Sequence, residues 1–177
     1  MTDLSDIEIL HVDDDPKFLS VVADLLEAAD SRITVTSAET PSEGIEQITT
    51  VAPDCVLTDY KLPGQTGIEF LQTVRESNPG LPVILLTGKG NEDVASKAIT
   101  AGATDYLQKK TALNHEQVLI NRIFNVVEQH HASKRAASLQ RIRSIVNDIN
   151  QALVRSESRS AIETCACEII SDADPYQ

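Results

Sequence analysis

The stretch Ile7-Glu8-Ile9-Leu10-His11-Val12, followed directly by Asp13-Asp14-Asp15, decides the fold of this chain. Its nearly continuous apolar residues are typical of a strand that is buried on both faces of a parallel sheet. Three more apolar runs also end in a polar or charged residue, and these are Cys55–Thr58 before Asp59, Val83–Leu86 before Thr87, and Asp105–Gln108 before Lys109. The carboxyl ends of parallel strands meet at one edge of the sheet, so we expect carboxylates, a hydroxyl and an ammonium to converge there. That combination indicates a Mg²⁺-dependent site for phosphoryl transfer.

Strand-like runs alternate along the chain with longer helical patterns. The runs predict strands at Ile7–Val12, Ile33–Thr36, Val56–Thr58, Val83–Thr87 and Tyr106–Gln108, and helices at Pro16–Ala29, Pro41–Thr49, Gly67–Ser77, Glu92–Ala101 and Glu116–His130. Five consecutive βα units predict an α/β fold in which a doubly wound parallel sheet has helices on both faces. The flavodoxin-like strand order 2-1-3-4-5 is the simplest arrangement for such units.

Three helix boundaries have a chemical signal of their own. Thr40-Pro41-Ser42-Glu43 has the pattern of a capping box with proline at the first helical position. Asp15 before Pro16 predicts the start of the first helix in the same way. Gly102 suits a left-handed cap after the fourth helix.

The chain has 177 residues, which is enough for one ordinary domain with some chain left over. Its net charge of −12 arises in residues 1–131, where 21 acidic residues face 9 basic ones, whereas residues 132–177 hold six of each. Because nucleic acid phosphates would be repelled by such a surface, we expect no direct binding of nucleic acid.

The cysteines and the apolar runs both favour a cytoplasmic protein. Cys55 lies within a buried-strand pattern and is interpreted as a small apolar residue, while Cys165 and Cys167 are two apart on a helix and face different directions. No apolar run reaches the roughly 18 residues that a membrane-spanning helix needs. We therefore predict no disulfide framework and no membrane association.

Residues 132–177 form a long helical extension in this interpretation. A second apolar stripe runs along it at 3-4-3-4 spacing, formed by Leu139, Ile142, Val146, Ile149 and Leu153. This spacing suits either a short coiled coil or the first helix of another domain, and we expect a homodimer through these last helices. Since about 46 residues cannot bury a core alone, the chain is expected to be a piece of a longer protein.

Adjacent carboxylates at the end of a strand repel one another unless a cation is present, and Mg²⁺ is the usual partner of such oxygens. Successive strand residues face opposite ways, so Asp13, Asp14 and Asp15 are not equivalent ligands. An acidic cap on the first helix is the alternative interpretation of these three residues. Asp59, Thr87 and Lys109 at matching strand ends favour the metal site.

Residues 5–131 resemble the receiver domain of two-component response regulators. The resemblance rests on four motifs, which are Val-Asp-Asp-Asp-Pro at 12–16, Pro-Asp-Cys-Val-Leu-Thr-Asp-Tyr-Lys-Leu-Pro-Gly-Gln-Thr-Gly at 53–67, Pro-Val-Ile-Leu-Leu-Thr-Gly at 82–88, and Ala-Gly-Ala-Thr-Asp-Tyr-Leu-Gln-Lys at 101–109. As a set, these motifs are specific to that family.

The resemblance implies a role for each residue of the site. Asp59 would accept a phosphoryl group from a phosphohistidine on a histidine kinase or phosphotransfer protein. Mg²⁺ would be held by Asp13, Asp14 and Asp59 together with the backbone carbonyl of Lys61, and Asp14 would be a direct ligand. Lys109 would neutralise the transferring group, and the Thr87 hydroxyl would bind a phosphoryl oxygen. Tyr106 would turn inward with Thr87 as a switch; its alternative interpretation is an edge-strand residue that is half-buried against the last helix.

The sequence also departs from the family at the functional lysine. Lys110 follows Lys109, where the family usually has a proline that is often cis. A non-proline cis bond costs about 3–4 kcal/mol, so the geometry at Lys109 is open at this point. Lys61 and Lys89 occupy positions that tune the phosphoryl lifetime in the family.

A looser resemblance covers the end of the chain. Leu139–Tyr176 is similar to the entry into a GAF-type sensor domain, and multidomain receivers of salt-adapted archaea often continue in this way. We thus predict a receiver domain at 1–131, followed at 132–177 by a signalling helix and the truncated start of a GAF-like domain. The output module would lie beyond this chain, and the full-length protein could be a histidine kinase.

Two rival functions use similar residues. A haloacid-dehalogenase-type phosphohydrolase would use Asp13 and Asp15 of an Asp-x-Asp motif, but Asp59 would then be unexplained and no acidic pair follows Lys109 on another strand. A receiver-like interaction module that works without phosphorylation is favoured only by Lys110. The preferred hypothesis is not a stand-alone enzyme but a module that is phosphorylated and dephosphorylated at Asp59 with Mg²⁺.

Overall fold

A five-stranded parallel sheet forms the centre of the protein. The computed structural model describes residues 6–88 and 92–155, and its strands lie in the order β2-β1-β3-β6-β7. Their bounds are β1 Ile7–Val12, β2 Ile33–Ala38, β3 Cys55–Asp59, β6 Val83–Thr87 and β7 Asp105–Gln108. Numbered as the five main strands, this is the order 2-1-3-4-5, so the predicted flavodoxin-like sheet is confirmed.

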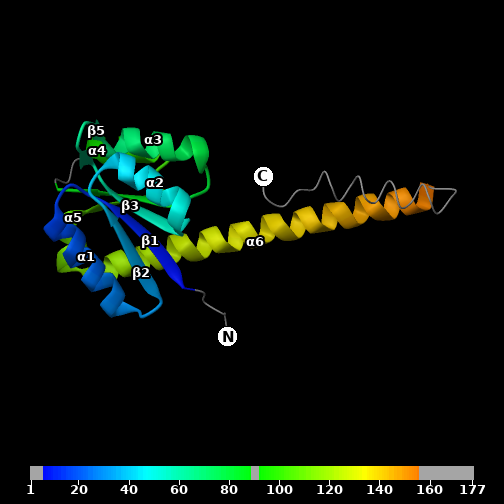
Figure 1. Ribbon diagram of the computed structural model, residues 1–177, viewed down its shortest axis with the longest axis horizontal. Helices are drawn as coiled ribbons and strands as arrows, with labels where there is room; N and C mark the ends of the chain where they lie inside the picture. The colour runs from blue at the N-terminus through cyan, green and yellow to red at the C-terminus, as the bar shows by residue number, and fades with distance from the viewer. Residues whose placement is uncertain (1–5, 89–91, 156–177) are drawn as a thin grey trace. The chain divides into compact units, whose positions relative to one another are not determined.

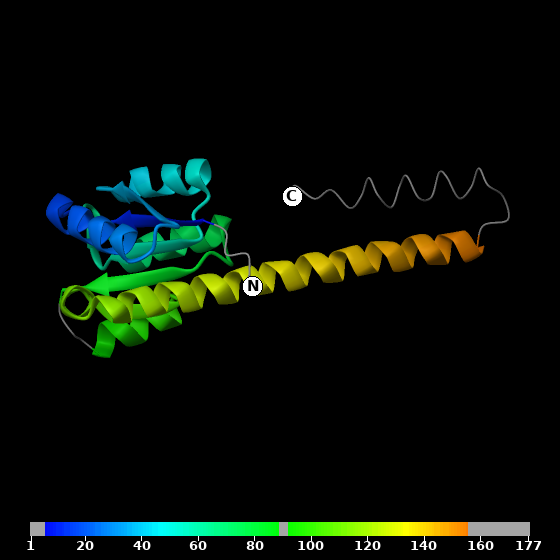
Figure 2. The same ribbon diagram turned by 90° about the horizontal axis from the view of Figure 1, so that it is seen from below.

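Helices cover both faces of this sheet (Figures 1 and 2). One face packs against α1 (Pro16–Ala29), α5 (Lys109–Asn114) and the start of α6 (Glu116–Arg155). The other packs against α2 (Pro41–Val51), α3 (Gly67–Ser77) and α4 (Glu92–Thr100). Every residue of β3 and β6 is buried, which explains why these strands are continuous apolar runs rather than alternating ones.

The helix starts follow from local hydrogen bonds. The Asp15 carboxylate accepts hydrogen bonds from the backbone N–H groups of Lys17 and Phe18, as expected for the cap of α1. Thr40 Oγ1 likewise accepts a hydrogen bond from the backbone N–H of Glu43. The Glu43 carboxylate, however, accepts from the backbone N–H of Glu39 and not from that of Thr40. The predicted capping box at α2 is therefore only half formed.

A complete capping box occurs instead at α3, which the sequence analysis did not predict. Thr66 Oγ1 accepts from the N–H of Glu69, while the Glu69 carboxylate accepts from the backbone N–H of Thr66. At the left-handed cap after α4, Gly102 has a φ of +91°, as its sequence position predicted.

Two small elements also escaped prediction. The loop after β3 contains a two-stranded antiparallel hairpin, β4 (Lys61–Leu62) and β5 (Gln65–Thr66). The short helix α5 starts at Lys109, where a loop was expected. No peptide bond among the described residues is cis, so the bond from Lys109 to Lys110 is trans.

The last helix, α6, is continuous over 40 residues. Its first part buries Leu119, Ile120, Ile123 and Val127 against the sheet. The chain contacts divide into two units, Met1–His130 and His131–Gln177, so this one helix belongs to both. Residues 156–177, with the GAF-like motif, lie outside the described residues. Among the helices described, none is both long and apolar enough to cross a membrane.

Gly67 lets the loop after β3 approach that strand closely. Its N–H donates to the Tyr60 carbonyl at 2.7 Å, and a Cβ at this position would lie 2.1 Å from the Asp59 carbonyl oxygen. Backbone atoms cannot withdraw from such a contact as a flexible side chain could. A glycine is therefore required here by space rather than by its φ angle.

We expect Gly67→Ala to lower the free energy of unfolding by about 1–3 kcal/mol, because the added methyl group displaces the backbone beside Asp59. Urea unfolding followed by circular dichroism measures this change. Gly88→Ala is the matched control, since a Cβ there would meet nothing within 4 Å. Equal stability of both variants and the parent would contradict the close-approach explanation.

Candidate functional site

The site lies at the carboxyl edge of the sheet, where four strands end. Asp13 follows β1, Asp59 ends β3, Thr87 ends β6, and Lys109 follows β7 as the first residue of α5. The pairing registers place Val12 beside Thr58 and Thr87 beside Gln108, so these strand ends are aligned with one another. The convergence that the sequence predicted is therefore present.

Lys109 joins two of the carboxylates. Its Nζ lies 2.6 Å from Asp13 Oδ2 and 2.9 Å from Asp59 Oδ2. It also lies 4.5 Å from the centre of the Phe18 ring, which presents a favourable face to the cation. Burial alone would lower the pKa of Lys109, but the two carboxylates outweigh it and raise this pKa. The ammonium therefore stays charged.

Asp13 is the most enclosed carboxylate of the site, because its side chain is fully buried. Oδ1 accepts a hydrogen bond from the backbone N–H of Asp15 at 3.0 Å. Burial raises the pKa of Asp13, and this effect exceeds the lowering by Lys109 and by the Asp15 N–H. The charged form of Asp13 is thus an unfavourable state that the fold maintains.

Asp14 points to solvent but remains close to the other two carboxylates. One oxygen from each of Asp13, Asp14 and Asp59 lies within 4.8 Å of the others. Within residues 6–88 and 92–155, the Asp14 carboxylate has neither a hydrogen-bond nor an ion-pair partner. Asp15, the third acidic residue of the run, is occupied as the cap of α1. The metal-site and helix-cap interpretations therefore apply to different residues of the same run.

A pocket of about 490 Å³ opens beside Asp59. Asp59, Thr87 and Lys109 line it, together with four residues from the adjoining loops and α4: Tyr60, Lys61, Gly88 and Val94. Thr87 is buried, being only 4% exposed, at the inner wall. The sequence analysis predicted a role for the backbone carbonyl of Lys61, but it did not identify Val94.

Tyr106 lies on β7, the edge strand of the sheet. It is half-buried, pairs in register with Leu85, and packs against the same apolar cluster as α4. Its neighbour Asp105 forms an ion pair with Arg122 of α6. The edge-strand position of Tyr106 is confirmed, but its apolar cluster is the one that contains α4 and not, as the alternative interpretation expected, the one that contains the last helix. Lys89 lies outside the described residues.

His11 and Phe18 border the site without having been included in the predicted site. The His11 ring is fully buried, with Nε2 3.9 Å from Asp13 Oδ2, and it meets the Phe18 ring edge to face at 5.5 Å. Burial, and secondarily the charge of Lys109, lower the pKa of His11 to about 3. The signal in the sequence was the period of two, which places His11 and Asp13 on one side of β1.

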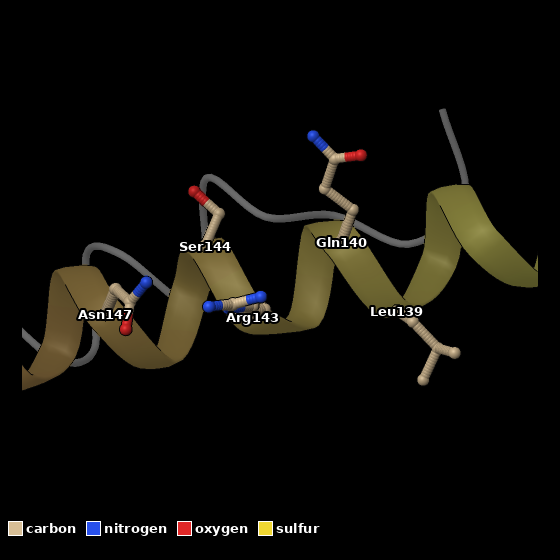
Figure 3. Close-up of a pocket in the computed structure, with 5 residues that line it drawn as sticks. All are labelled: Leu139, Gln140, Arg143, Ser144 and Asn147. Carbon is tan, nitrogen blue, oxygen red and sulfur yellow. The ribbon is translucent and has the colours of Figure 1, made fainter.

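Another pocket lies on α6 and does not have the character of a site. Its lining residues are Leu139, Gln140, Arg143, Ser144 and Asn147, all from consecutive turns of one helix. In Figure 3 these side chains point in different directions, with Leu139 opposite Gln140 and Ser144. Polar groups that diverge in this way do not recognise one ligand.

Comparisons with known proteins agree with this geometry. The family model described as response regulator receiver domain matches residues 9–123. A CheY-like response regulator receiver domain protein from Methanospirillum hungatei is 28% identical with a TM-score of 0.66, covering 73% of this chain and 99% of that chain. A receiver domain protein from Clostridium thermocellum is 31% identical with a TM-score of 0.65, covering 71% and 98%.

Curated relatives match the same part of the chain. The DNA-binding transcriptional regulator NtrC of Escherichia coli K12 is 33% identical over 111 residues, which are 63% of this chain and 23% of NtrC. The probable transcriptional regulatory protein TcrX of Mycobacterium tuberculosis is 34% identical over 114 residues, or 64% and 47%. The chain spans less than half of the length of these two relatives.

We expect Asp13→Asn to make the free protein more stable at pH 7, because it removes a buried charge whose pKa the fold raises. This gain in the free energy of unfolding becomes smaller as pH falls toward 4, because the Asp13 carboxyl of the parent then becomes protonated and no longer opposes folding. Urea unfolding midpoints at several pH values measure this.

The exposed Asp14→Asn is the control for the same loss of charge, and we expect it to change stability by no more than about 0.5 kcal/mol. A loss of stability in Asp13→Asn at pH 7 would show that the ion pair with Lys109 outweighs the cost of burial.

Proposed function

The chain belongs to the family of response regulator receiver domains, and on that premise we propose that it accepts a phosphoryl group on Asp59 from a partner histidine kinase or phosphotransfer protein. One observation carries this proposal. The Asp59 carboxylate faces an open pocket while Lys109 holds its Oδ2 at 2.9 Å, and both Asp13 and Asp14 lie beside it. A nucleophile, a cation and an entry path for a phosphoryl group are therefore together.

In this transfer, an Asp59 oxygen attacks phosphorus as the bond between phosphorus and the partner's histidine nitrogen breaks. The electrons of that bond return to the imidazole, and an acyl phosphate forms on Asp59. Lys109 reaches the transferring group from the side of Asp13, and the Thr87 hydroxyl lies at the pocket wall to bind a phosphoryl oxygen. Catalysis consists mainly of positioning and charge neutralisation.

The donor set suits Mg²⁺, which prefers carboxylate and carbonyl oxygens. Asp13, Asp14 and Asp59 would hold the ion with the Lys61 carbonyl, and the unpartnered Asp14 carboxylate is the direct ligand we propose. When bound, Mg²⁺ supplies positive charge that stabilises the phosphoryl oxygens during transfer. Lys109 alone offsets only part of the charge of three carboxylates.

We propose that phosphorylation shifts an existing equilibrium through Thr87 and Tyr106. Thr87 ends β6, and Tyr106 lies on the neighbouring strand β7, half-buried and next to Asp105. Asp105 is paired with Arg122. A displacement of Thr87 toward the phosphoryl group therefore has a connected route through β7 to α6.

The second part of α6 is the proposed output lever, with a domain boundary near residue 131. We propose that a GAF-like domain follows this helix, in a multidomain protein similar to those of salt-adapted archaea. Its output module, a histidine kinase module among the options, would lie beyond this chain. Because a histidine kinase obtains its phosphoryl group from ATP, we place the transfer in the cytoplasm. Residues 1–131 carry the acidic net charge, which would repel nucleic acid phosphates. This charge supports the proposal that the fragment does not bind nucleic acid directly.

The same helix offers a surface for a homodimer. Leu139, Ile142 and Val146 are 68%, 55% and 49% exposed, although all three are apolar. Their 3-4 spacing is that of a coiled-coil seam, in which a second copy buries each of them. We propose that two chains associate through this stripe.

Incubation with acetyl phosphate and Mg²⁺ should add one phosphoryl group to the parent, measured by intact mass. Asp59→Asn should gain none, because it lacks the nucleophile. Chelation of Mg²⁺ should reduce the rate at least tenfold.

Phosphorylation of Asp59→Asn to the parent level would show that another residue is the acceptor. If the parent gains no mass from acetyl phosphate, a phosphorylated histidine kinase domain replaces it as donor. Failure with both donors would favour a receiver-like module that works without phosphorylation.

Beryllofluoride with Mg²⁺, an analogue of the phosphoryl group, should change amide hydrogen exchange in residues 131–155 of α6. The expected change is at least twofold, because the lever couples this helix to the site. Asp59→Asn with the same additions is the control. Identical exchange with and without the analogue in the parent would remove the lever from the proposal.

Ile142→Glu should shift the protein toward monomer in sedimentation equilibrium, since a charge at the seam opposes its burial. We expect at least a tenfold weaker dimer. Gln140→Glu changes the charge equally on another side of the helix and should leave the association unchanged. A parent that stays monomeric at the highest concentration would contradict the proposed homodimer.

A further inference from the structure

His11 is a polar residue in an apolar layer, and the proposed phosphotransfer does not use it. Its ring is fully buried in β1 on the side that packs against α1 and α6. Among the described residues, neither Nδ1 nor Nε2 has a hydrogen-bond partner. Buried polar groups are normally paired, so a histidine left in this state needs an explanation.

The ring is directed at the site rather than away from it. His11 and Asp13 are two residues apart on one strand, so their side chains share a face. Nε2 lies 3.9 Å from Asp13 Oδ2, about 1 Å longer than a hydrogen bond. The contact with Phe18 fixes the ring from another side. A small movement would therefore join the two groups.

Asp13 Oδ2 is the oxygen that has a vacancy for such a bond. Oδ1 already accepts from the Asp15 N–H, whereas the one close partner of Oδ2 within the described part of the chain is the Lys109 ammonium at 2.6 Å. Lys109 is shared with Asp59. When Lys109 turns toward a phosphoryl group on Asp59, the buried Oδ2 loses part of that contact.

We propose that His11 is a positioning residue, whose neutral imidazole donates its Nε2–H to Asp13 Oδ2 and holds this carboxylate in its metal-binding orientation when Lys109 engages the phosphoryl group. This inference rests on the proposed function, because it concerns the loaded site. The ring acts through Asp13 and touches neither the metal nor the phosphoryl group.

The chemistry of the ring suits this role. A neutral imidazole carries one N–H, and it adds no second positive charge beside Lys109. Partners that orient the ligands of a metal site commonly change metal affinity by about 10–100-fold when they are removed. A leucine at position 11 would keep the packing but would lack an N–H donor. A glutamine would instead supply a side-chain amide N–H from the same position.

The first test is nuclear magnetic resonance of the parent chain with ¹⁵N-labelled histidine. The spectrum is recorded for the free protein, with Mg²⁺, and with Mg²⁺ and beryllofluoride, and His11→Leu assigns the His11 signals. We expect the Nε2–H tautomer throughout, with its proton moving downfield when the site is loaded. The Nδ1–H tautomer, or an Nε2–H signal unaffected by loading, would overturn the proposal.

The second test separates this role from a packing role. We expect His11→Leu to weaken Mg²⁺ binding about tenfold in a titration of the Asp14 and Asp59 amide signals. The same variant should unfold at a higher urea concentration, because it removes unpaired buried nitrogens. His11→Gln should recover most of the Mg²⁺ affinity, and the matched control Ile9→Val should leave it unchanged.

Each outcome distinguishes this inference from the proposed function. If the parent binds Mg²⁺ and beryllofluoride but His11→Leu binds Mg²⁺ equally well, only the role of His11 is refuted. A packing role is indicated if His11→Leu loses stability and affinity together and His11→Gln does not recover the affinity. If the parent binds neither ligand at Asp59, the proposed function fails, and the role of His11 fails with it.

Discussion

The position of the Lys109 ammonium between Asp13 and Asp59 is the interaction on which the site depends. Lys109 contacts two carboxylates, a third lies within 4.8 Å of them, and Asp13 is completely buried. In water such charges would separate, but the strand ends hold them in place. The free site therefore holds less positive than negative charge, an imbalance that suits a divalent cation.

Packing on both faces of the sheet holds the strand ends that carry these charges. The strands that end at Asp59 and Thr87 are buried on both faces, and helices pack against each side. Gly67 then brings the following loop into backbone contact with the end of β3, which gives the pocket wall its position. Clustering the carboxylates costs free energy, and the apolar packing on both faces of the sheet offsets this cost.

Stability and function act in opposite directions at this edge. The buried charge of Asp13 and the His11 ring, which has no hydrogen-bond partner among the described residues, both weaken the folded state. Asp13 belongs to the acidic cluster, and the His11 ring lies directly behind it. Groups that are unfavourable in the free state are available to new partners in the loaded one. The helix α6 packs against the same sheet through its first part and is continuous to Arg155.

The five βα units and the strand-end residues Asp13, Asp59, Thr87 and Lys109 could be predicted from the sequence alone, because buried strands and their polar ends have local patterns. The strand order was the simplest choice for such units rather than a property of any one segment, and the strand pairing confirms it. The three-dimensional structure was needed to show which carboxylates share Lys109, and that Lys109 begins a short helix with a trans bond to Lys110. It also showed that Glu69 rather than Glu43 completes a capping box, and that His11 Nε2 lies 3.9 Å from Asp13 Oδ2. The contacts of Lys109 join side chains from different elements, and no periodicity along one segment encodes the distances between them.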